Sequence, residues 1–212
     1  MLSHGLRSQD LYFSDPRHAA ECKGKERWRM KNIYLLVGPS GSGKTTLAQR
    51  MADFYGMKVV QSYTTRPPRY EGEVGHIFVS DEEFDQLGKM VAYTEYGGYR
   101  YGVTQEIVDT YDIYVIDPYG VSYLQSKYTG PKMPIVVWLS ATEEQRREHM
   151  GRRGDSEEAI QHRLLLDRKE FDNGSYDFVP DLVLPATNRG GRGLAAKADL
   201  LATYIRYLEE FC

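Results

Sequence analysis

The sequence predicts a three-layer α/β fold, in which a mostly parallel sheet is covered by helices on both faces. Short apolar runs rich in β-branched residues alternate with segments that carry helix-start signals, a pattern typical of parallel sheets. A glycine-rich loop at residues 38–45 joins the first apolar run to the first helical segment. With 212 residues, the chain is long enough to form one such domain with a substantial core.

The predicted elements follow one another in a regular order. Strands are predicted at short apolar runs, namely Ile33–Val37, Lys58–Ser62, Ile113–Asp117, Ile135–Leu139 and Leu182–Leu184. Helices are predicted where capping residues or helical periodicity begin, near Thr46, Ser80, Ser140, Asp155 and Leu194, the last running to Phe211. We therefore expect one folded domain over residues 30–212.

Two segments depart from this alternation. Residues 62–104 are rich in glycine, tyrosine and turn signals, and this composition favours an inserted lobe. Residues 1–29 show little apolar periodicity, so we interpret them as a poorly ordered N-terminal extension. A helix docked on the surface of the domain is the alternative interpretation of this extension.

The glycine-rich loop Gly38–Thr45 fits the pattern G-x-x-x-x-G-K-[ST], the phosphate-binding P-loop. Its glycines let the backbone wrap a polyphosphate with N–H groups turned inward, and the helix N-terminus that follows adds partial positive charge. Lys44 can bridge the β- and γ-phosphates of ATP, and the Thr45 hydroxyl can bind Mg²⁺. The predicted ATP site comprises Gly38, Ser40, Gly41, Ser42, Gly43, Lys44, Thr45 and Thr46.

Charge and composition exclude several classes of function. The net charge is −3, so we expect no nucleic-acid partner. No apolar run reaches the roughly 18 residues of a membrane span, and the N-terminus lacks the apolar core of a secretory signal. The two cysteines, Cys22 and Cys212, match no metal or redox spacing. We expect a cytoplasmic protein that acts on small molecules and has no obligate protein partner.

A second motif lies one predicted strand beyond the P-loop helix. In the run Thr64–Arg69, two arginines flank two prolines, and a stiffened pair of guanidinium groups suits bidentate phosphate binding. This motif and three later runs resemble the guanylate kinases over about residues 32–210, the runs being Gly72–His76, Tyr99–Gly102 and Arg152–Glu158. The resemblance implies the fold of P-loop NTPases, with an acceptor-binding lobe at about 62–104 and a helical lid at about 146–170.

The resemblance also implies roles for single residues. Arg153 and Arg163 would reach from the lid and clamp the transferring phosphoryl group. Asp117 would accept hydrogen bonds from a base, and a cap of the turn at Pro118 is the alternative role for this residue. The acceptor site implied in this way comprises Ser62, Arg66, Arg69, His76, Glu95, Tyr101 and Asp117.

Departures from the family's pattern cluster on the acceptor side. The glutamate that reads guanine in the family aligns with Ala92, with Glu95 nearby, and the serine or threonine after its Y-Y-G segment is Val103. The segment Gly75–Ile77 and Val103 are also similar to ribose 1,5-bisphosphate phosphokinases, which need no guanine pocket. Guanylate-kinase-like domains that only bind proteins are a third alternative, but they typically lose the P-loop lysine, which this chain keeps as Lys44.

The sequence therefore predicts ATP-dependent phosphoryl transfer to a nucleoside monophosphate, GMP or dGMP, with Mg²⁺ as the cofactor. The predicted catalytic residues are Lys44, Arg153 and Arg163. An acceptor phosphate is already ionised, so positioning and charge neutralisation suffice and no general base is expected. A sugar-phosphate kinase is the first alternative, and a non-catalytic protein-binding module is the second.

Overall fold

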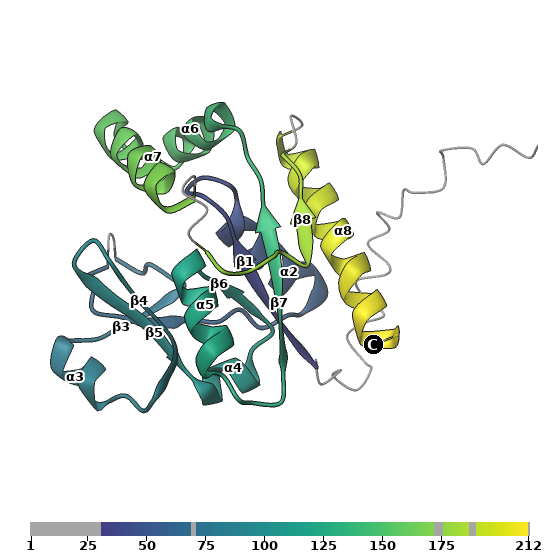
Figure 1. Cartoon of the computed structure of the whole chain (residues 1–212). Coiled ribbons are helices and arrows are strands. Elements are labelled where there is room, and N and C mark those ends of the chain that lie inside the picture. The colour runs from purple at the N-terminus through teal and green to yellow at the C-terminus, as the bar shows by residue number, and fades with distance from the viewer. Residues whose placement is uncertain (1–30, 69–70, 172–175, 187–189, 212) are drawn as a thin grey trace, which may run out of the picture.

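A computed structural model describes residues 31–68, 71–171, 176–186 and 190–211 (Figure 1). Its main sheet contains β1 (Asn32–Val37), β6 (Ile113–Val115), β7 (Met133–Leu139) and β8 (Leu182–Leu184) in the order β6-β1-β7-β8. All neighbouring strands of this sheet are parallel. The predicted α/β fold with a parallel sheet is therefore confirmed.

Helices cover both faces of this sheet. Helices α2 (Lys44–Tyr55) and α8 (Gly190–Phe211) pack on one face, and α4 (Gln105–Thr110) and α5 (Pro118–Lys127) pack on the other. Successive side chains of a strand point to opposite faces, so β1 contributes to both cores. Its residues Tyr34 and Leu36 pack against α2 and α8, whereas Ile33, Leu35 and Val37 pack against α5.

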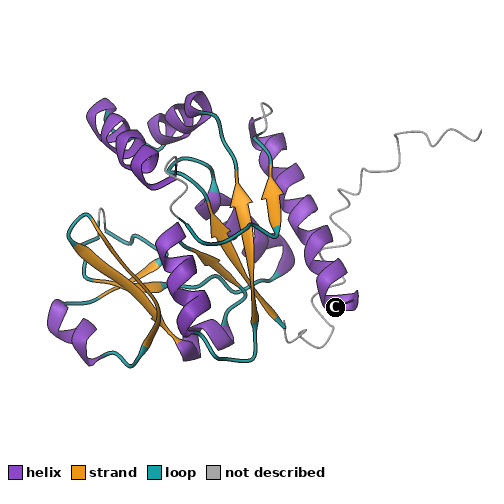
Figure 2. Cartoon of the chain, in the orientation of Figure 1, coloured by secondary structure: helices purple, strands orange, loops and turns teal. Residues whose placement is uncertain are grey.

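A second sheet forms the inserted lobe, which lies beside the main sheet (Figure 2). Its strands are β2 (Ser62–Thr64), β3 (His76–Phe78), β4 (Met90–Tyr96) and β5 (Tyr99–Thr104), in the order β3-β2-β5-β4. The β4–β5 and β2–β5 pairs are antiparallel, and the short helix α3 (Asp81–Gln86) follows β3. The lobe is joined to the core because β4 packs along α5.

The predicted strand Lys58–Ser62 is wrong in its extent. Only Val59 forms a bridge, to Ile113 of the main sheet, and Ser62 already begins β2 of the lobe. Asp112 accepts the Lys58 N–H at 2.9 Å, and the Ile113 carbonyl accepts the Val60 N–H at 2.8 Å. The segment therefore pairs with the edge of the main sheet at Val59 alone, because three residues later, at Ser62, the chain is already part of the second sheet.

Helices α6 (Glu143–Arg152) and α7 (Glu157–Phe171) contain the predicted lid, residues 146–170. Thr142 caps α6 by accepting the Gln145 N–H, so the N-cap lies two residues beyond Ser140, where the capping pattern predicts it. Gly154 lies in the left-handed region with φ 90°, which turns the chain from α6 into α7. Met150, Ile160 and Leu164 form a small apolar core of their own between the two helices.

Several predictions fall outside the described residues. These include the N-terminal extension, Arg69 and both cysteines. Within the described part of the chain, no helix combines the length and the apolar character that crossing a bilayer requires.

Candidate active site

The P-loop follows β1 and opens α2 at the carboxyl edge of the parallel strands. Gly41 and Gly43 have φ of 77° and 96°, a region that suits glycine and turns the loop backbone around its centre. Gly43 is the N-cap of α2 and provides no side-chain cap, while Thr45 and Thr46 in the first turn are exposed. The N–H groups at this helix start therefore have no side-chain acceptor from the N-cap, as an anion site requires.

Lys44 bends back over the loop. Its Nζ donates to the carbonyl of Gly38 at 2.5 Å and to the carbonyl of Pro39 at 3.1 Å. Burial lowers the pKa of Lys44 to about 8, against the opposing effect of nearby carboxylates, chiefly Asp167. The ammonium group thus lies in a poorly solvated place where a phosphate would be a better partner than two carbonyls.

The carboxylates of Asp117, Asp167 and Glu170 lie near Lys44, and only Asp117 was predicted as a site residue. Asp117 caps α5 by accepting the Gly120 N–H at 2.8 Å, and burial raises its pKa. Burial, followed by the charges of Asp117 and Asp167, raises the pKa of Glu170 to about 7. Asp167 and Glu170 share one face of α7 with Arg163, at helical spacing i, i+4 and i+7, and that periodicity is the signal that identifies them in the sequence.

The lobe brings most of the predicted phosphate-binding residues together. Ser62 Oγ lies 2.9 Å from His76 Nδ1, because β2 and β3 pair at these two residues. The ring of Tyr101 lies edge-on to His76, with centroids 5.7 Å apart, and Tyr101 also interacts with Arg66. Four of the predicted residues, from three strands and the loop after β2, therefore line one side of the lobe.

Arg66 forms a buried bidentate ion pair that the sequence analysis did not predict. Its Nη1 and Nη2 donate to the Glu73 carboxylate at 3.2 and 2.9 Å, and both side chains are less than a tenth exposed. The Nε of Arg66 is buried without a hydrogen-bond partner among the described residues. A buried donor without an acceptor is costly, so this position suits an anionic ligand.

The side of the site predicted to read a base is largely apolar. Ala92 and Val103 are 1% and 0% exposed and pack into the core beneath the lobe. Thr94 interacts with Asp117, whereas Glu95 is exposed and accepts the Tyr93 hydroxyl at 2.5 Å. Neighbouring strand residues point to opposite faces, so the structure does not bring Glu95 and Asp117 together.

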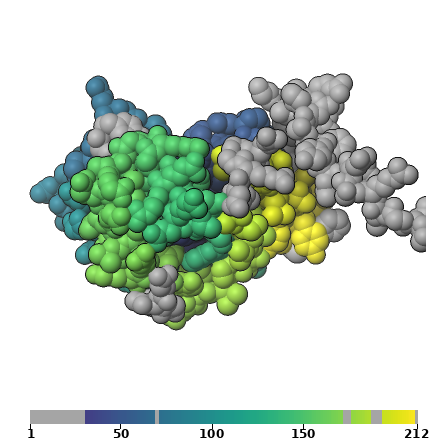
Figure 3. Space-filling view, turned by 90° about the horizontal axis from the view of Figure 1, so that it is seen from above, coloured from purple at the N-terminus to yellow at the C-terminus, as the bar shows by residue number. Residues whose placement is uncertain are grey.

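The two predicted lid arginines meet at one carboxylate. Arg153 Nε donates to Asp155 at 3.1 Å, and Arg163 Nε lies 3.8 Å from the same carboxylate. Seen from above, α6 and α7 cover the middle of the molecule (Figure 3). The charges of Asp167 and Arg163 act on the Tyr96 hydroxyl at the end of β4, so the lobe approaches α7. Lid and lobe thus face one another beside the P-loop.

Comparisons with known proteins agree with this architecture. The guanylate kinase family profile matches residues 30–181. The guanylate kinase of Neisseria gonorrhoeae is 36% identical over 166 residues, which cover 72% of this chain and 80% of that protein. The guanylate kinase of Anaeromyxobacter dehalogenans is 34% identical over 162 residues, covering 69% and 71% of the two chains.

A solved structure supports the fold independently. The crystal structure of guanylate kinase from Anaplasma phagocytophilum superposes with a TM-score of 0.56 at 21% identity, covering 86% of this chain and 88% of that one. At this identity the superposition shows the shared fold. The matched profile and the curated relatives go further, and the chain belongs to the guanylate kinase family, whose members are nucleoside monophosphate kinases.

Proposed function

We propose that this protein transfers the γ-phosphoryl group of ATP to a phosphate oxygen of GMP or dGMP. The observation that carries the proposal is the P-loop at the start of α2, where an uncapped helix N-terminus, a poorly solvated Lys44 and exposed Thr45 and Thr46 lie together. This combination suits a polyphosphate with a divalent cation. The names of the curated relatives point to the same reaction.

The donor site fits the residues that are present. The backbone N–H groups from Gly41 to Thr45 would cradle the phosphates, and Lys44 would leave its carbonyl partners to contact them. No group of three or more His, Cys, Asp or Glu side chains among the described residues is placed to bind a metal. Mg²⁺ would be held by the Thr45 hydroxyl and the phosphates, as the P-loop pattern implies, and would neutralise charge on the phosphoryl oxygens.

The acceptor phosphate would sit in the lobe. Ser62, His76 and Tyr101 offer polar groups at one place, and Arg66 adds an Nε that has no partner within the described part of the chain. Arg69, outside the described residues, is proposed as a further phosphate ligand. Glu73 holds the Arg66 guanidinium by its other edge, which fixes the orientation of the remaining donor. Asp117 remains a proposed ligand of the base, whereas Glu95 lies on the opposite face of β4 from Thr94, which meets Asp117, and contacts Tyr93 instead.

Transfer itself would need positioning more than covalent chemistry. The acceptor phosphate is already a nucleophile, so the protein has to align it with ATP and exclude water. Arg153 and Arg163 would exchange Asp155 for the transferring phosphoryl group when the lid, residues 146–170, closes over the lobe, residues 62–104. In this proposal residues 1–29 are a dispensable extension and the protein works in the cytoplasm.

A sugar-phosphate acceptor such as ribose 1,5-bisphosphate is the second candidate. It is favoured by one observation, namely that Ala92 and Val103 offer only buried apolar surface where the family resemblance implies polar groups that read guanine. A site with fewer polar groups discriminates bases less, since fewer groups go unpaired with the wrong ligand. The phosphate-binding residues would serve either acceptor.

A panel of acceptors tests the proposal directly. The protein is incubated with Mg-ATP and GMP, dGMP, AMP, CMP, UMP or ribose 1,5-bisphosphate, and ADP production is measured. We expect turnover with GMP and dGMP above that with the other nucleotides. Turnover with ribose 1,5-bisphosphate alone would replace the proposal by the second candidate, and no turnover with any acceptor would contradict both.

A further inference from the structure

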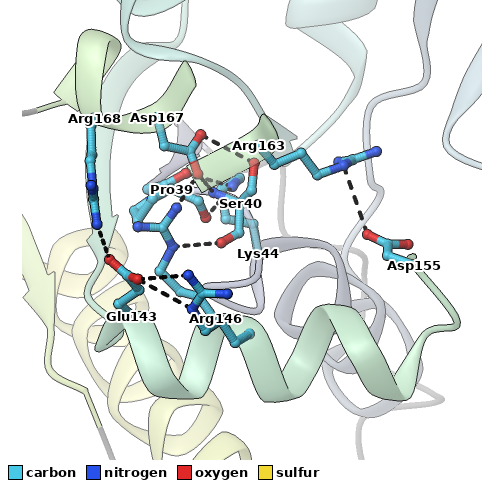
Figure 4. A network of polar contacts seen from close by, with 11 residues as sticks. Pro39, Ser40, Lys44, Glu143, Arg146, Asp155, Arg163, Asp167 and Arg168 are labelled. Carbon is cyan, nitrogen blue, oxygen red and sulfur yellow. Dashed lines mark hydrogen bonds and ion pairs between the residues drawn. The ribbon is translucent and has the colours of Figure 1, made fainter. Parts of the chain in front are cut away.

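The P-loop is held from outside by two helices that come more than 100 residues later in the chain. Asp167 of α7 accepts the Ser40 N–H at 2.8 Å and the Ser40 hydroxyl at 3.1 Å. Arg146 of α6 donates its Nε to the Ser40 carbonyl at 2.8 Å, and its Nη2 pairs with Asp167 (Figure 4). The backbone N–H and the carbonyl of Ser40 are thus both bound by lid side chains.

The backbone of α6 also touches the loop directly. A Cβ on Gly41 would lie 2.7 Å from the Arg146 carbonyl oxygen and 3.0 Å from the Arg146 Cα. His149 Nδ1 lies 2.7 Å from the Gly41 carbonyl, and its N–H is the donor. Gly41 has φ 77°, so a side chain there would be excluded both by the backbone conformation and by α6. Ser40 and Gly41 therefore cannot shift without moving α6.

Arg146 and Asp167 form a buried ion pair, and burying two charges costs solvation free energy that some role of the pair has to offset. Arg146 is 9% exposed and Asp167 is 4% exposed. Two apolar side chains of similar volume commonly stabilise a core at least as well as a buried ion pair, so the pair is weak evidence for a role in stability alone. What the pair binds is the N–H, hydroxyl and carbonyl of Ser40 in the P-loop, whose backbone shape determines phosphate binding. The charge of Asp167 raises the pKa of Lys44 and the charge of Arg146 lowers it, so the two charges partly offset each other at this lysine.

We propose that Arg146 and Asp167 are positioning residues that hold the P-loop in its phosphate-binding shape and fix both ends of the lid to it. The part of the lid that closes is then centred on Gly154 and excludes Arg146, His149 and Asp167, which are bonded to the loop. The proposal rests on the proposed function, because it takes the P-loop as the ATP site. It assigns a purpose to two residues that touch neither substrate in the proposed function.

Three variants test this assignment. Asp167→Asn keeps an oxygen that can accept from Ser40 and removes the charge that pairs with Arg146. The double variant Arg146→Met with Asp167→Leu removes both charges and roughly conserves volume, so no buried charge is left unpaired. Arg168→Ala is the matched control, because Arg168 bridges the same two helices through Glu143 at 2.7 Å on the exposed side.

The readouts are the melting temperature, the Kd of a fluorescent ATP analogue with Mg²⁺, and kcat and KM for ATP. We expect Asp167→Asn to raise the Kd and the KM for ATP about tenfold. We expect the double variant to melt near the unmodified protein and to keep that tenfold loss, with Arg168→Ala unchanged in every readout. If the pair only stabilised the fold, the double variant would recover normal ATP binding together with its melting temperature.

Normal ATP binding by Asp167→Asn, or by a stable double variant, would overturn the proposal. A failure of the proposed function looks different, since the unmodified protein would then bind the ATP analogue and phosphorylate none of the acceptors. Failure of the unmodified protein to bind the analogue would overturn both the ATP site and the positioning role.

Discussion

Raising the pH should deprotonate Lys44 of the P-loop and so lower the activity of the enzyme. Burial lowers the pKa of Lys44 to about 8, and its Nζ is held by the carbonyls of Gly38 and Pro39. Only the ammonium form can neutralise phosphate charge. Deprotonation near pH 8 therefore removes the same interaction that a substitution of Lys44 removes.

The size of the effect follows from the pKa. With a pKa of about 8, roughly nine tenths of the enzyme carries the ammonium at pH 7 and roughly one tenth at pH 9. The kcat/KM for ATP reports the enzyme without bound ATP, so it should fall about tenfold between these pH values. Bound phosphates favour the charged form, so the kcat should stay level to a higher pH than kcat/KM.

The assay is ADP production from saturating GMP and varied Mg-ATP between pH 6 and 10. Lys44→Ala should lose on the order of 10² to 10⁴ in kcat/KM, about 3–5 kcal/mol of transition-state stabilisation. Its residual activity should show no decline near pH 8. The same decline in Lys44→Ala would assign the titration to another group, and a flat profile for the unmodified protein would refute the reasoning.

The same pKa shift of Lys44 should make folding stability rise with pH while activity falls, which gives an independent check. The folded pKa of Lys44 lies below the ordinary lysine value of 10.5, so the unfolded chain binds more protons between pH 8 and 10.5. The contribution of Lys44 to folding stability therefore rises with pH through this window. We expect the melting-temperature difference between the unmodified protein and Lys44→Ala to shift in favour of the unmodified protein as pH rises.

Three further predictions concern the site. Burial and the neighbouring carboxylates raise the pKa of Glu170 from 4.5 to about 7, so its contribution to stability is lost as pH rises through that range; Glu170→Gln should melt higher than the unmodified protein at pH 8 and little differently at pH 4.5. Glu73→Ala leaves Arg66 buried without its partner and should lower the unfolding free energy in urea by about 3–5 kcal/mol; a change below about 1 kcal/mol would contradict a buried pair. Arg153→Ala should lower kcat more than it raises the KM for ATP, because the arginine binds mainly the transition state; a raised KM with kcat unchanged would assign it to substrate binding.

Local sequence determines the donor side of this protein. The P-loop pattern, the apolar run before it and the helix after it are contiguous, so residues 33–55 predict their own structure and chemistry. The parallel sheet follows from the alternation of apolar runs with capped helices, and Ser80 caps α3 together with Glu83 as the local pattern predicts. Helix α5 carries a local signal too, since Asp117 precedes a proline at the first position of the helix, although no helix was predicted for this segment.

Only the tertiary structure decided which side chains meet across the chain. The extent of the strand predicted at Lys58–Ser62 was wrong, because β propensity does not say which of two sheets a segment will join. The partners of the buried charged side chains were likewise decided by the tertiary structure. Nothing local shows that Glu73 binds Arg66, that Glu95 faces away from Asp117, or that Asp167 reaches back 127 residues to Ser40. Contiguous backbone conformation sets a phosphate loop, whereas the desolvation that gives buried charges their partners exists only once distant elements have packed.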